Sequence, residues 1–200
     1  RGVILEDDCA VSNEFWSDMQ LVMQSLPDKW DVIFLSINMF VERVPEVVGE
    51  MFLRSFGNTG AFCYMVNQKS AKQILNFIST HRLVGCIDII LSKDFGTEHN
   101  VFVYNRRIAF QQPHNSDTTG KFEDYSYAFT TKHNEHIKTS IYPYDTDYLN
   151  SVKFFDKVDI PMYWINLDRS VARLLQFQVS VCPYFDNHNR ISAVDGSELP

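Results

Sequence analysis

The sequence has few cysteines and no long apolar run. Its 200 residues include only four cysteines, and none of them belongs to a Cys-x-x-Cys pair. Thiols spaced this widely argue against a zinc site or a redox motif and are typical of buried free cysteines. No apolar stretch reaches the roughly 18 residues that a membrane-spanning helix requires. These absences favour a globular chain, and we expect no membrane span within it.

Basic charge is also scarce. The chain has 18 Lys and Arg against 25 Asp and Glu, a formal net charge of -7. A domain that binds nucleic acid is expected to be basic, so we expect no nucleic-acid partner. The acidic balance suits a site built from carboxylates and a divalent metal. No Asn-x-Ser/Thr sequon occurs, which weighs toward the cytoplasm and against the lumen of the endoplasmic reticulum.

Short apolar segments alternate with amphipathic ones along most of the chain. Strands are expected near residues 2–5, 31–36, 61–66, 101–104, 163–167 and 190–194, and helices near residues 12–26, 70–78 and 171–181. Strand, helix and strand at the C-terminal end form one βαβ unit, which predicts the α/β class. Residues 39–55 have weak periodicity and are expected to form a variable loop. Residues 121–160 are predicted to connect a first part, 1–120, to a second, 161–200.

Three acids follow the first apolar segment. Glu6, Asp7 and Asp8 would repel one another strongly without a cation. In an extended backbone Glu6 and Asp8 point to the same side, an arrangement that suits Mg²⁺ or Mn²⁺. A solvated loop, or the charged first turn of a helix, explains the same acids equally well.

Two further places hold candidate functional side chains. Asp88 lies between Ile87 and Ile89, and an acid in an apolar segment is costly to bury unless it is paired or useful. It is a candidate general base, and a helix N-cap is the alternative. A short polar loop contains His114, a candidate metal ligand or phosphate contact, and Asp117, a second candidate base. A plain surface turn is the alternative there.

In their order along the chain, these pieces resemble glycosyltransferase family 25, which includes bacterial lipooligosaccharide galactosyltransferases and procollagen galactosyltransferases. The matching pieces are residues 4–8 (Ile-Leu-Glu-Asp-Asp), 30–35 (Trp-Asp-Val-Ile-Phe-Leu), 60–66 with 69–75, Asp88 before residues 89–91, and Gln112 with Ser116 and Asp117. Residues 163–170 (Tyr-Trp-Ile-Asn-Leu-Asp-Arg-Ser) and 190–199 are similar to the family's opening.

That opening precedes the acidic motif in the family, but here it follows it. Two tandem transferase units, cut so that the chain is a piece of a longer protein, would explain this order. A circular permutation is the alternative. The family's stretch between the opening and the acidic motif, with its Cys-x-x-Ser-His element, is missing from both ends.

The resemblance implies a nucleotide-diphospho-sugar transferase (GT-A-like) fold, incomplete here, with a mostly parallel sheet flanked by helices. It implies an inverting enzyme of glycan or lipopolysaccharide biosynthesis that moves galactose or glucose from a UDP-sugar to a hydroxyl of a glycan or hydroxylysine-type acceptor. The implied metal, Mn²⁺ or Mg²⁺, would be held by Glu6, Asp7, Asp8 and His114. Asp88 or Asp117 would be the catalytic base, and the nucleotide would be bound by Asn166, Asp168, Arg169, Arg173 and Asp195.

Two other functions fit the sequence less well, and a third stays open. A response-regulator receiver needs a phospho-accepting Asp near the middle of the chain and a later Lys at a strand end, and no convincing pair is present. A phosphohydrolase of the Asp-x-Asp type needs a pattern that Asp8, Cys9 and Ala10 do not supply. A non-catalytic nucleotide-sugar- or glycan-binding scaffold derived from the family stays open.

The reversed order of the two motifs leads to a structural prediction. Without a neighbour, the strand at residues 2–5 would expose an unpaired apolar edge, which is an aggregation liability. A connector of residues 121–160 is long enough to return a partner strand, because loop closure costs grow slowly with length. We therefore predict that residues 163–167 lie parallel to residues 2–5, with Asp168 and Arg169 near the three acids. The tandem arrangement predicts a detached C-terminal piece instead.

Overall fold

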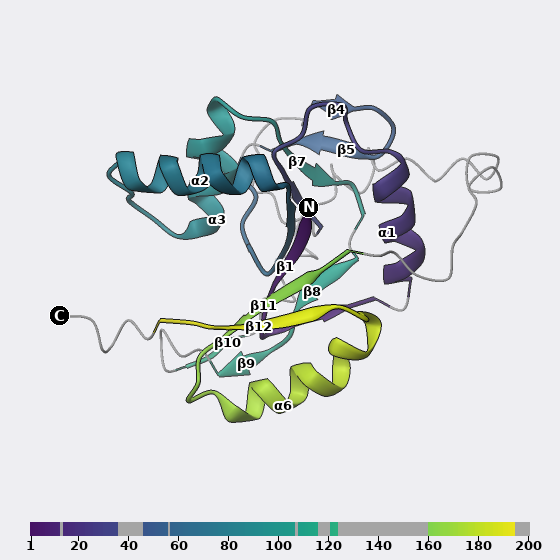
Figure 1. The fold of residues 1–200 in the computed structure, drawn as a ribbon, viewed down its shortest axis with the longest axis vertical. Coiled ribbons are helices and arrows are strands. Elements are labelled where there is room, and N and C mark those ends of the chain that lie inside the picture. Colours follow the sequence, from purple (N-terminus) through teal and green to yellow (C-terminus); the bar gives the residue numbers. More distant parts are fainter. Residues whose placement is uncertain are drawn as a thin grey trace.

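The computed structural model describes residues 1–12, 14–35, 46–55, 57–106, 108–115, 121–123 and 160–194. These form a mixed eight-stranded sheet with helices on both faces (Figure 1). The strand order is β12 (His188–Ser192), β11 (Met162–Asn166), β1 (Gly2–Glu6), β6 (Cys63–Val66), β3 (Val32–Phe34), β7 (Val101–Tyr104), β5 (Phe52–Arg54) and β4 (Val47–Val48).

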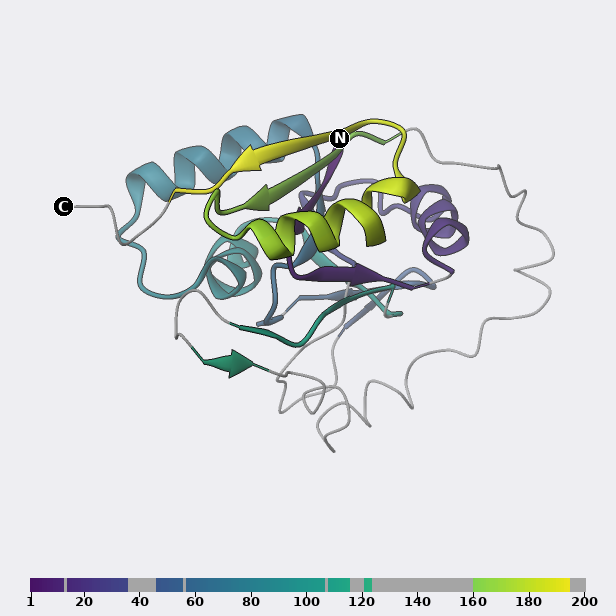
Figure 2. The same cartoon turned by 90° about the horizontal axis from the view of Figure 1, so that it is seen from below.

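The C-terminal βαβ unit joins the same sheet as the N-terminal strand. β1 pairs in parallel with β11, with Val3 opposite Met162, and β11 pairs in parallel with β12. Figure 2 shows β11 and β12 beside the N-terminal strand. The predicted strand pairing is therefore confirmed, and the alternative of a detached C-terminal piece is wrong.

The expectation of a mostly parallel sheet is wrong in detail. β6 runs antiparallel to both β1 and β3, and β5 runs antiparallel to both β7 and β4. Among the neighbouring pairs, only β1 with β11, β11 with β12 and β3 with β7 are parallel. A short buried strand has the same apolar composition in either direction, so its sequence does not reveal its sense.

Each face of the sheet has its own apolar core. On one face, α1 (Phe15–Gln24) and α6 (Val171–Ser180) cover side chains such as Leu5, Ile33 and Trp164. On the other face, α2 (Gln68–Thr80) and the helical segment of α3 (Ile87–Ile89), η1 (Ile90–Asp94) and η2 (Phe95–Thr97) cover Val32 and Phe34. This alternation along β3 follows the two-residue period of a strand. A short η4 (Cys182–Tyr184) follows α6.

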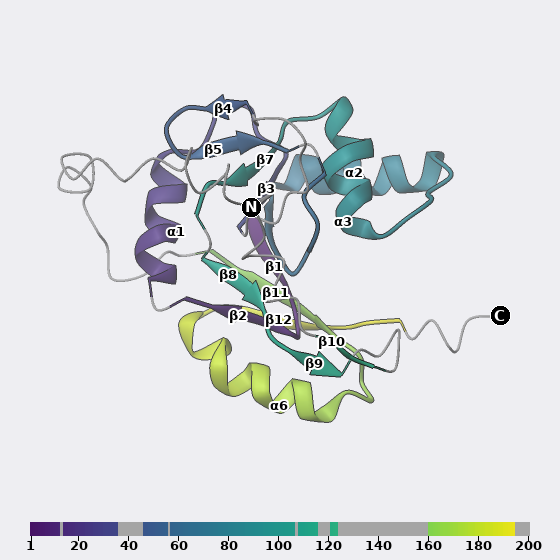
Figure 3. The same cartoon turned by 180° about the vertical axis from the view of Figure 1, so that it is seen from behind.

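Two small antiparallel pairs stand outside the main sheet. β2 (Cys9–Val11) pairs with β8 (Ala109–Gln111), and β9 (His114–Asn115) pairs with β10 (Phe122–Glu123). Figure 3 shows β2 and β8 on the side of the molecule that carries α6. The loop expected at residues 39–55 instead contributes β4 and β5 where the structure describes it. Most of the predicted connector lies outside the described residues.

None of the helices in the described residues has the length and apolar composition that a membrane crossing requires.

Candidate functional site

The three acids lie where β1 leaves the main sheet. β1 ends at Glu6, and Asp7 and Asp8 form the turn that leads into β2. The expectation of an extended backbone from Glu6 through Asp8 is therefore wrong, and strand alternation does not align their side chains. The chain turns here because β2 departs from the sheet to pair with β8.

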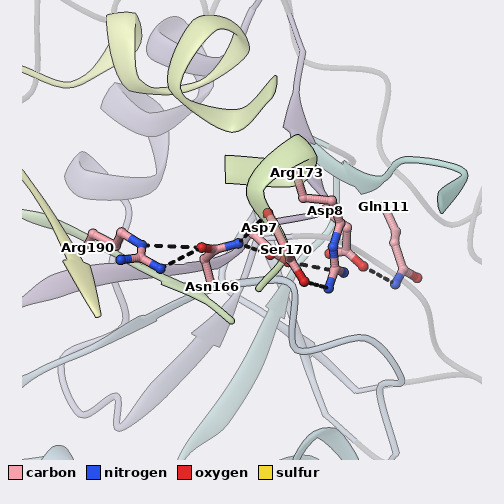
Figure 4. A network of polar contacts seen from close by, with 7 residues as sticks. All are labelled: Asp7, Asp8, Gln111, Asn166, Ser170, Arg173 and Arg190. Carbon is pink, nitrogen blue, oxygen red and sulfur yellow. Dashed lines mark hydrogen bonds and ion pairs between the residues drawn. The ribbon is translucent and has the colours of Figure 1, made fainter. Parts of the chain in front are cut away.

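Asp7 is held by two side chains of the C-terminal βαβ unit (Figure 4). Its Oδ2 accepts a hydrogen bond from Nδ2 of Asn166 at 2.5 Å, and its Oδ1 lies 3.2 Å from Nη1 of Arg173. Burial raises the pKa of Asp7, while the Asn166 hydrogen bond and the Arg173 charge oppose that rise. The contacts follow from the parallel pairing of β1 with β11, which brings the carboxyl ends of both strands to one edge.

Asn166 connects Asp7 to a second charged pair. It is almost fully buried at the end of β11, and its Oδ1 accepts hydrogen bonds from Nε and Nη2 of Arg190 at 3.2 and 2.8 Å. Nη2 of Arg190 also lies 2.5 Å from Oδ1 of Asp168. Hydrogen bonds from Ser192 and Arg190 lower the pKa of the exposed Asp168 carboxyl group. Asp168 thus contacts Arg190 and Ser192 of β12, whereas Asn166 contacts the acids through Asp7.

The side chain of Asp8 accepts a hydrogen bond from a residue of β8. Its Oδ2 accepts a hydrogen bond from Nε2 of Gln111 at 2.7 Å. Beside it lies a pocket of about 10 Å³, lined by Asp7, Asp8, Cys9, Gln112, Pro113, Arg173, Gln176, Phe177 and Ser180. That volume holds about one water molecule. In this conformation the space between α6 and the turn is therefore too small for a nucleotide.

Glu6 is the acid whose carboxyl group is most strongly affected by its surroundings through burial and neighbouring charge. Its pKa is raised from 4.5 to about 8, mainly by burial and further by the negative charges of Asp8, Asp88 and Asp7. The positive charge of Arg173 opposes that rise. Within the described part of the chain, no hydrogen bond reaches the Glu6 carboxyl group. The local crowding of negative charge therefore favours either a proton or a cation at this carboxylate.

Asp88 lies close enough to act on the charge of Glu6, and it anchors a glycine turn. Its Oδ2 accepts a hydrogen bond from the backbone N–H of Gly60 at 2.8 Å, and its Oδ1 accepts one from Ile89 at 2.8 Å. Gly60 has a φ of 92°, and a Cβ there would lie 2.3 Å from the Phe62 ring, so the turn needs glycine. Asp88 thus makes the contacts of an anchoring residue. Each carboxylate oxygen still has a second lone pair that can accept a proton.

The other candidates are placed only in part. Asp117 and Asp195 lie outside the described residues, as does the side chain of His114, whose backbone forms β9. Arg169 is exposed in the turn after β11. The residues that the structure brings together at the acidic end of β1 are Glu6, Asp7, Asp8, Asp88, Asn166 and Arg173.

Two residues of this network were not singled out from the sequence. Gln111 ends the strand that pairs with β2, and Arg190 lies opposite Trp164 on the strand next to β11. The available signal was position: both belong to segments adjoining candidate motifs. Their contacts depend on the pairing register, which a single sequence does not specify.

Among the described residues, no group of three or more His, Cys, Asp and Glu side chains is arranged to hold a metal ion. Comparisons of the chain with protein-family models, characterised proteins and solved structures give no match. The family resemblance therefore remains a prediction.

Proposed function

We propose that this chain is part of a metal-dependent, inverting glycosyltransferase that moves a hexose from a UDP-sugar to a hydroxyl group of a glycan or hydroxylysine-type acceptor. The supporting observation is that two transferase-like motifs, far apart in sequence, meet at one edge of the sheet. Asp7 of the acidic motif accepts a hydrogen bond from Asn166 and forms an ion pair with Arg173, and both partners belong to the C-terminal motif. Ligands of open α/β sheets bind at such strand ends.

The acid cluster fits a cation that takes few ligands from the protein. Mg²⁺ and similar ions are commonly held by one or two carboxylates together with substrate phosphates and water, so a cage of three protein ligands is not required. Asp7 is already paired with Arg173, which leaves Glu6 and Asp8 as the proposed ligands. Burial is the largest cause of the raised pKa of Glu6, and the negative charges of Asp8, Asp88 and Asp7, which a cation would offset, add to it. When bound, such a cation supplies charge stabilisation for a departing diphosphate.

The chain's own residues would position the reactants. Asn166 and Arg173 fix the orientation of Asp7, and so the turn that carries Asp8. Arg173 also places a guanidinium group, which binds phosphate well, at the carboxyl edge of the sheet. Asp88 is the proposed general base for the acceptor hydroxyl, using lone pairs that its backbone hydrogen bonds leave available.

A second candidate function is nucleotide-sugar or glycan binding without catalysis. One observation favours it: the described residues contain no group of three side chains arranged to hold a metal ion. A scaffold of this kind would bind a UDP-sugar but would not consume it.

The test is an assay of UDP-galactose and UDP-glucose turnover by the intact protein with Mn²⁺, alongside calorimetric titration with UDP. Glu6→Gln and Asp8→Asn should abolish Mn²⁺-dependent turnover, and Asp28→Asn, at an exposed acid, should not. Binding of UDP without turnover by the wild-type protein would favour the scaffold. Absence of both would reject the proposed function.

A further inference from the structure

A second pocket lies at the opposite edge of the sheet from the acids. β1, β3 and β7 run in the same direction, because β6 is antiparallel to both β1 and β3, and β3 is parallel to β7. Glu6 ends β1, whereas His99 comes just before β7 and Lys69 lies in the first turn of the helix after β6. The pocket has a volume of about 450 Å³ and is lined by Lys69, Lys72, Gln73, Asn76, Phe77, His81, Glu98 and His99.

One wall of this pocket is a polar face of α2. Lys69, Lys72, Gln73 and Asn76 follow the i, i+3, i+4, i+7 spacing that places helical residues on one side. The other wall comes from the segment between η2 and β7, which contributes Glu98 and His99. The pocket is therefore a groove between two elements, and its volume lies within the range of small-molecule sites.

Each of the two histidines stacks on the phenylalanine four residues before it and contacts the carbonyl oxygen of that residue. In Phe77-x-x-x-His81, the rings stack with centroids 4.1 Å apart, and Nδ1 of His81 lies 3.0 Å from the carbonyl oxygen of Phe77. In Phe95-x-x-x-His99, the rings stack at 3.7 Å, and Nδ1 of His99 lies 3.0 Å from the carbonyl oxygen of Phe95. The two phenylalanine rings contact each other edge to face at 5.6 Å. Both imidazoles are thus fixed on one aromatic base.

These contacts indicate which ring nitrogen carries the proton. A carbonyl oxygen only accepts, so the contact with Phe95 assigns the proton of His99 to Nδ1. Nδ1 of His81 lies 3.0 Å from both the carbonyl oxygen of Phe77 and Oγ1 of Thr80, and the Thr80 hydroxyl donates to the carbonyl oxygen of Asn76, so the same tautomer fits His81. Nε2 is then the nitrogen that remains to meet a ligand. Capping of a helix end explains the Nδ1 contacts alone. It does not explain why both rings line one pocket with two lysines.

The charges of the side chains that line the pocket indicate an anionic ligand. The pocket gathers two ammonium groups and two imidazoles against the single carboxylate of Glu98, in a chain whose formal net charge is -7. A metal is not favoured, because the described residues contain no group of three suitable ligands. Lysine binds phosphate and similar oxyanions as a point charge. A bare oxyanion would fill only part of the volume, and the amides of Gln73 and Asn76 suit sugar hydroxyls.

We propose that this pocket binds a sugar carrying a phosphate or sulfate ester, with Lys69 and Lys72 facing the ester and the amides and imidazoles facing the sugar. The site is separate from the acidic edge and does not depend on transferase activity there. Its ligand is an anionic monosaccharide, alone or at the end of a glycan.

The test is calorimetric titration of the intact protein with glucose 6-phosphate, glucose 6-sulfate, glucose and inorganic phosphate. We expect at least one ester to bind in saturable fashion, more tightly than glucose or inorganic phosphate. The combined Lys69→Gln and Lys72→Gln variant should bind it roughly tenfold or more weakly, because charge-assisted hydrogen bonds are lost. Lys93→Gln, at an exposed lysine outside the pocket, is the matched control and should bind normally.

Binding of only one ester identifies phosphate or sulfate as the group recognised. Imidazole NMR signals of His81 and His99, assigned with His→Gln variants, should shift on titration and so place the ligand. The proposal is overturned if neither ester binds, if glucose or inorganic phosphate binds as tightly, or if the double lysine variant binds like wild type while its thermal midpoint is unchanged.

Discussion

The side-chain amide of Asn166 lies 2.5 Å from the carboxylate of Asp7, although 159 positions separate them in sequence. Asn166 is almost fully buried, and its other polar atom accepts hydrogen bonds from Arg190. One amide therefore joins the ends of β1, β11 and β12. This contact fixes the acidic turn to the C-terminal βαβ unit.

Replacing Asn166 should destabilise the fold. Asn166→Ala would remove partners from both Asp7 and Arg190, and unmade buried hydrogen bonds cost about 1–3 kcal/mol. Urea unfolding should show a free energy of unfolding lowered by about that amount, with an unchanged denaturant slope. Asn189→Ala, at an exposed asparagine of β12, should have little effect. Equal stability of the two variants would show that the hydrogen bonds of Asn166 do not contribute to the free energy of unfolding.

Elements with a clear apolar pattern were predictable from the sequence. The strand at residues 101–104 has the expected bounds, and the helix expected near residues 171–181 is α6, Val171–Ser180. The pairing of β1 with β11 followed from a physical requirement, because an apolar strand needs neighbours.

What the sequence did not predict depends on long-range geometry. β5 has three residues, too few to establish a period, and the direction of β6 leaves no mark on its composition. At the site, the acids and Asn166 were recognisable by type and position. The turn at Asp7 and the roles of Gln111 and Arg190 depend on where β2 and β12 pair.

Metal dependence should require Glu6 and Asp8. If they hold the proposed cation, Glu6→Ala or Asp8→Ala should abolish Mn²⁺-dependent sugar transfer by the intact protein. Circular dichroism should show that both variants stay folded. Dialysis against EDTA should remove the wild-type activity, and added Mn²⁺ should restore it. Normal turnover by both variants would mean that the acids serve another purpose.

Glu6 should also make stability depend on pH. Its pKa is about 8 in the folded protein against an ordinary value of 4.5, so in that interval the folded state binds a proton that the unfolded chain has released. The free energy of unfolding should therefore fall as pH rises from about 4.5 to 8, by an amount on the order of a few kcal/mol.

Urea unfolding at both ends of this range is the measurement. Glu6→Gln should flatten the dependence, and Glu50→Gln, at an exposed glutamate, should leave it intact. In the wild-type protein, Mn²⁺ should recover stability at the alkaline end, where the carboxylate is ionised. A pH profile of Glu6→Gln that matches wild type would argue against a buried proton on Glu6.

Asp88 has two candidate roles, general base for the acceptor hydroxyl and anchor of the turn at Gly60, and two variants distinguish them. If Asp88 is the general base, Asp88→Asn should keep UDP-sugar binding while transfer falls by roughly 10²-fold or more. Its carboxylate also holds the N–H of Gly60, so the comparison is Gly60→Ala, which disturbs the same turn and keeps the carboxylate. We expect Asp88→Asn to lose far more transfer than Gly60→Ala at comparable loss of thermal stability. If transfer falls in proportion to stability in both variants, Asp88 only anchors the turn, and the proton acceptor must be another group.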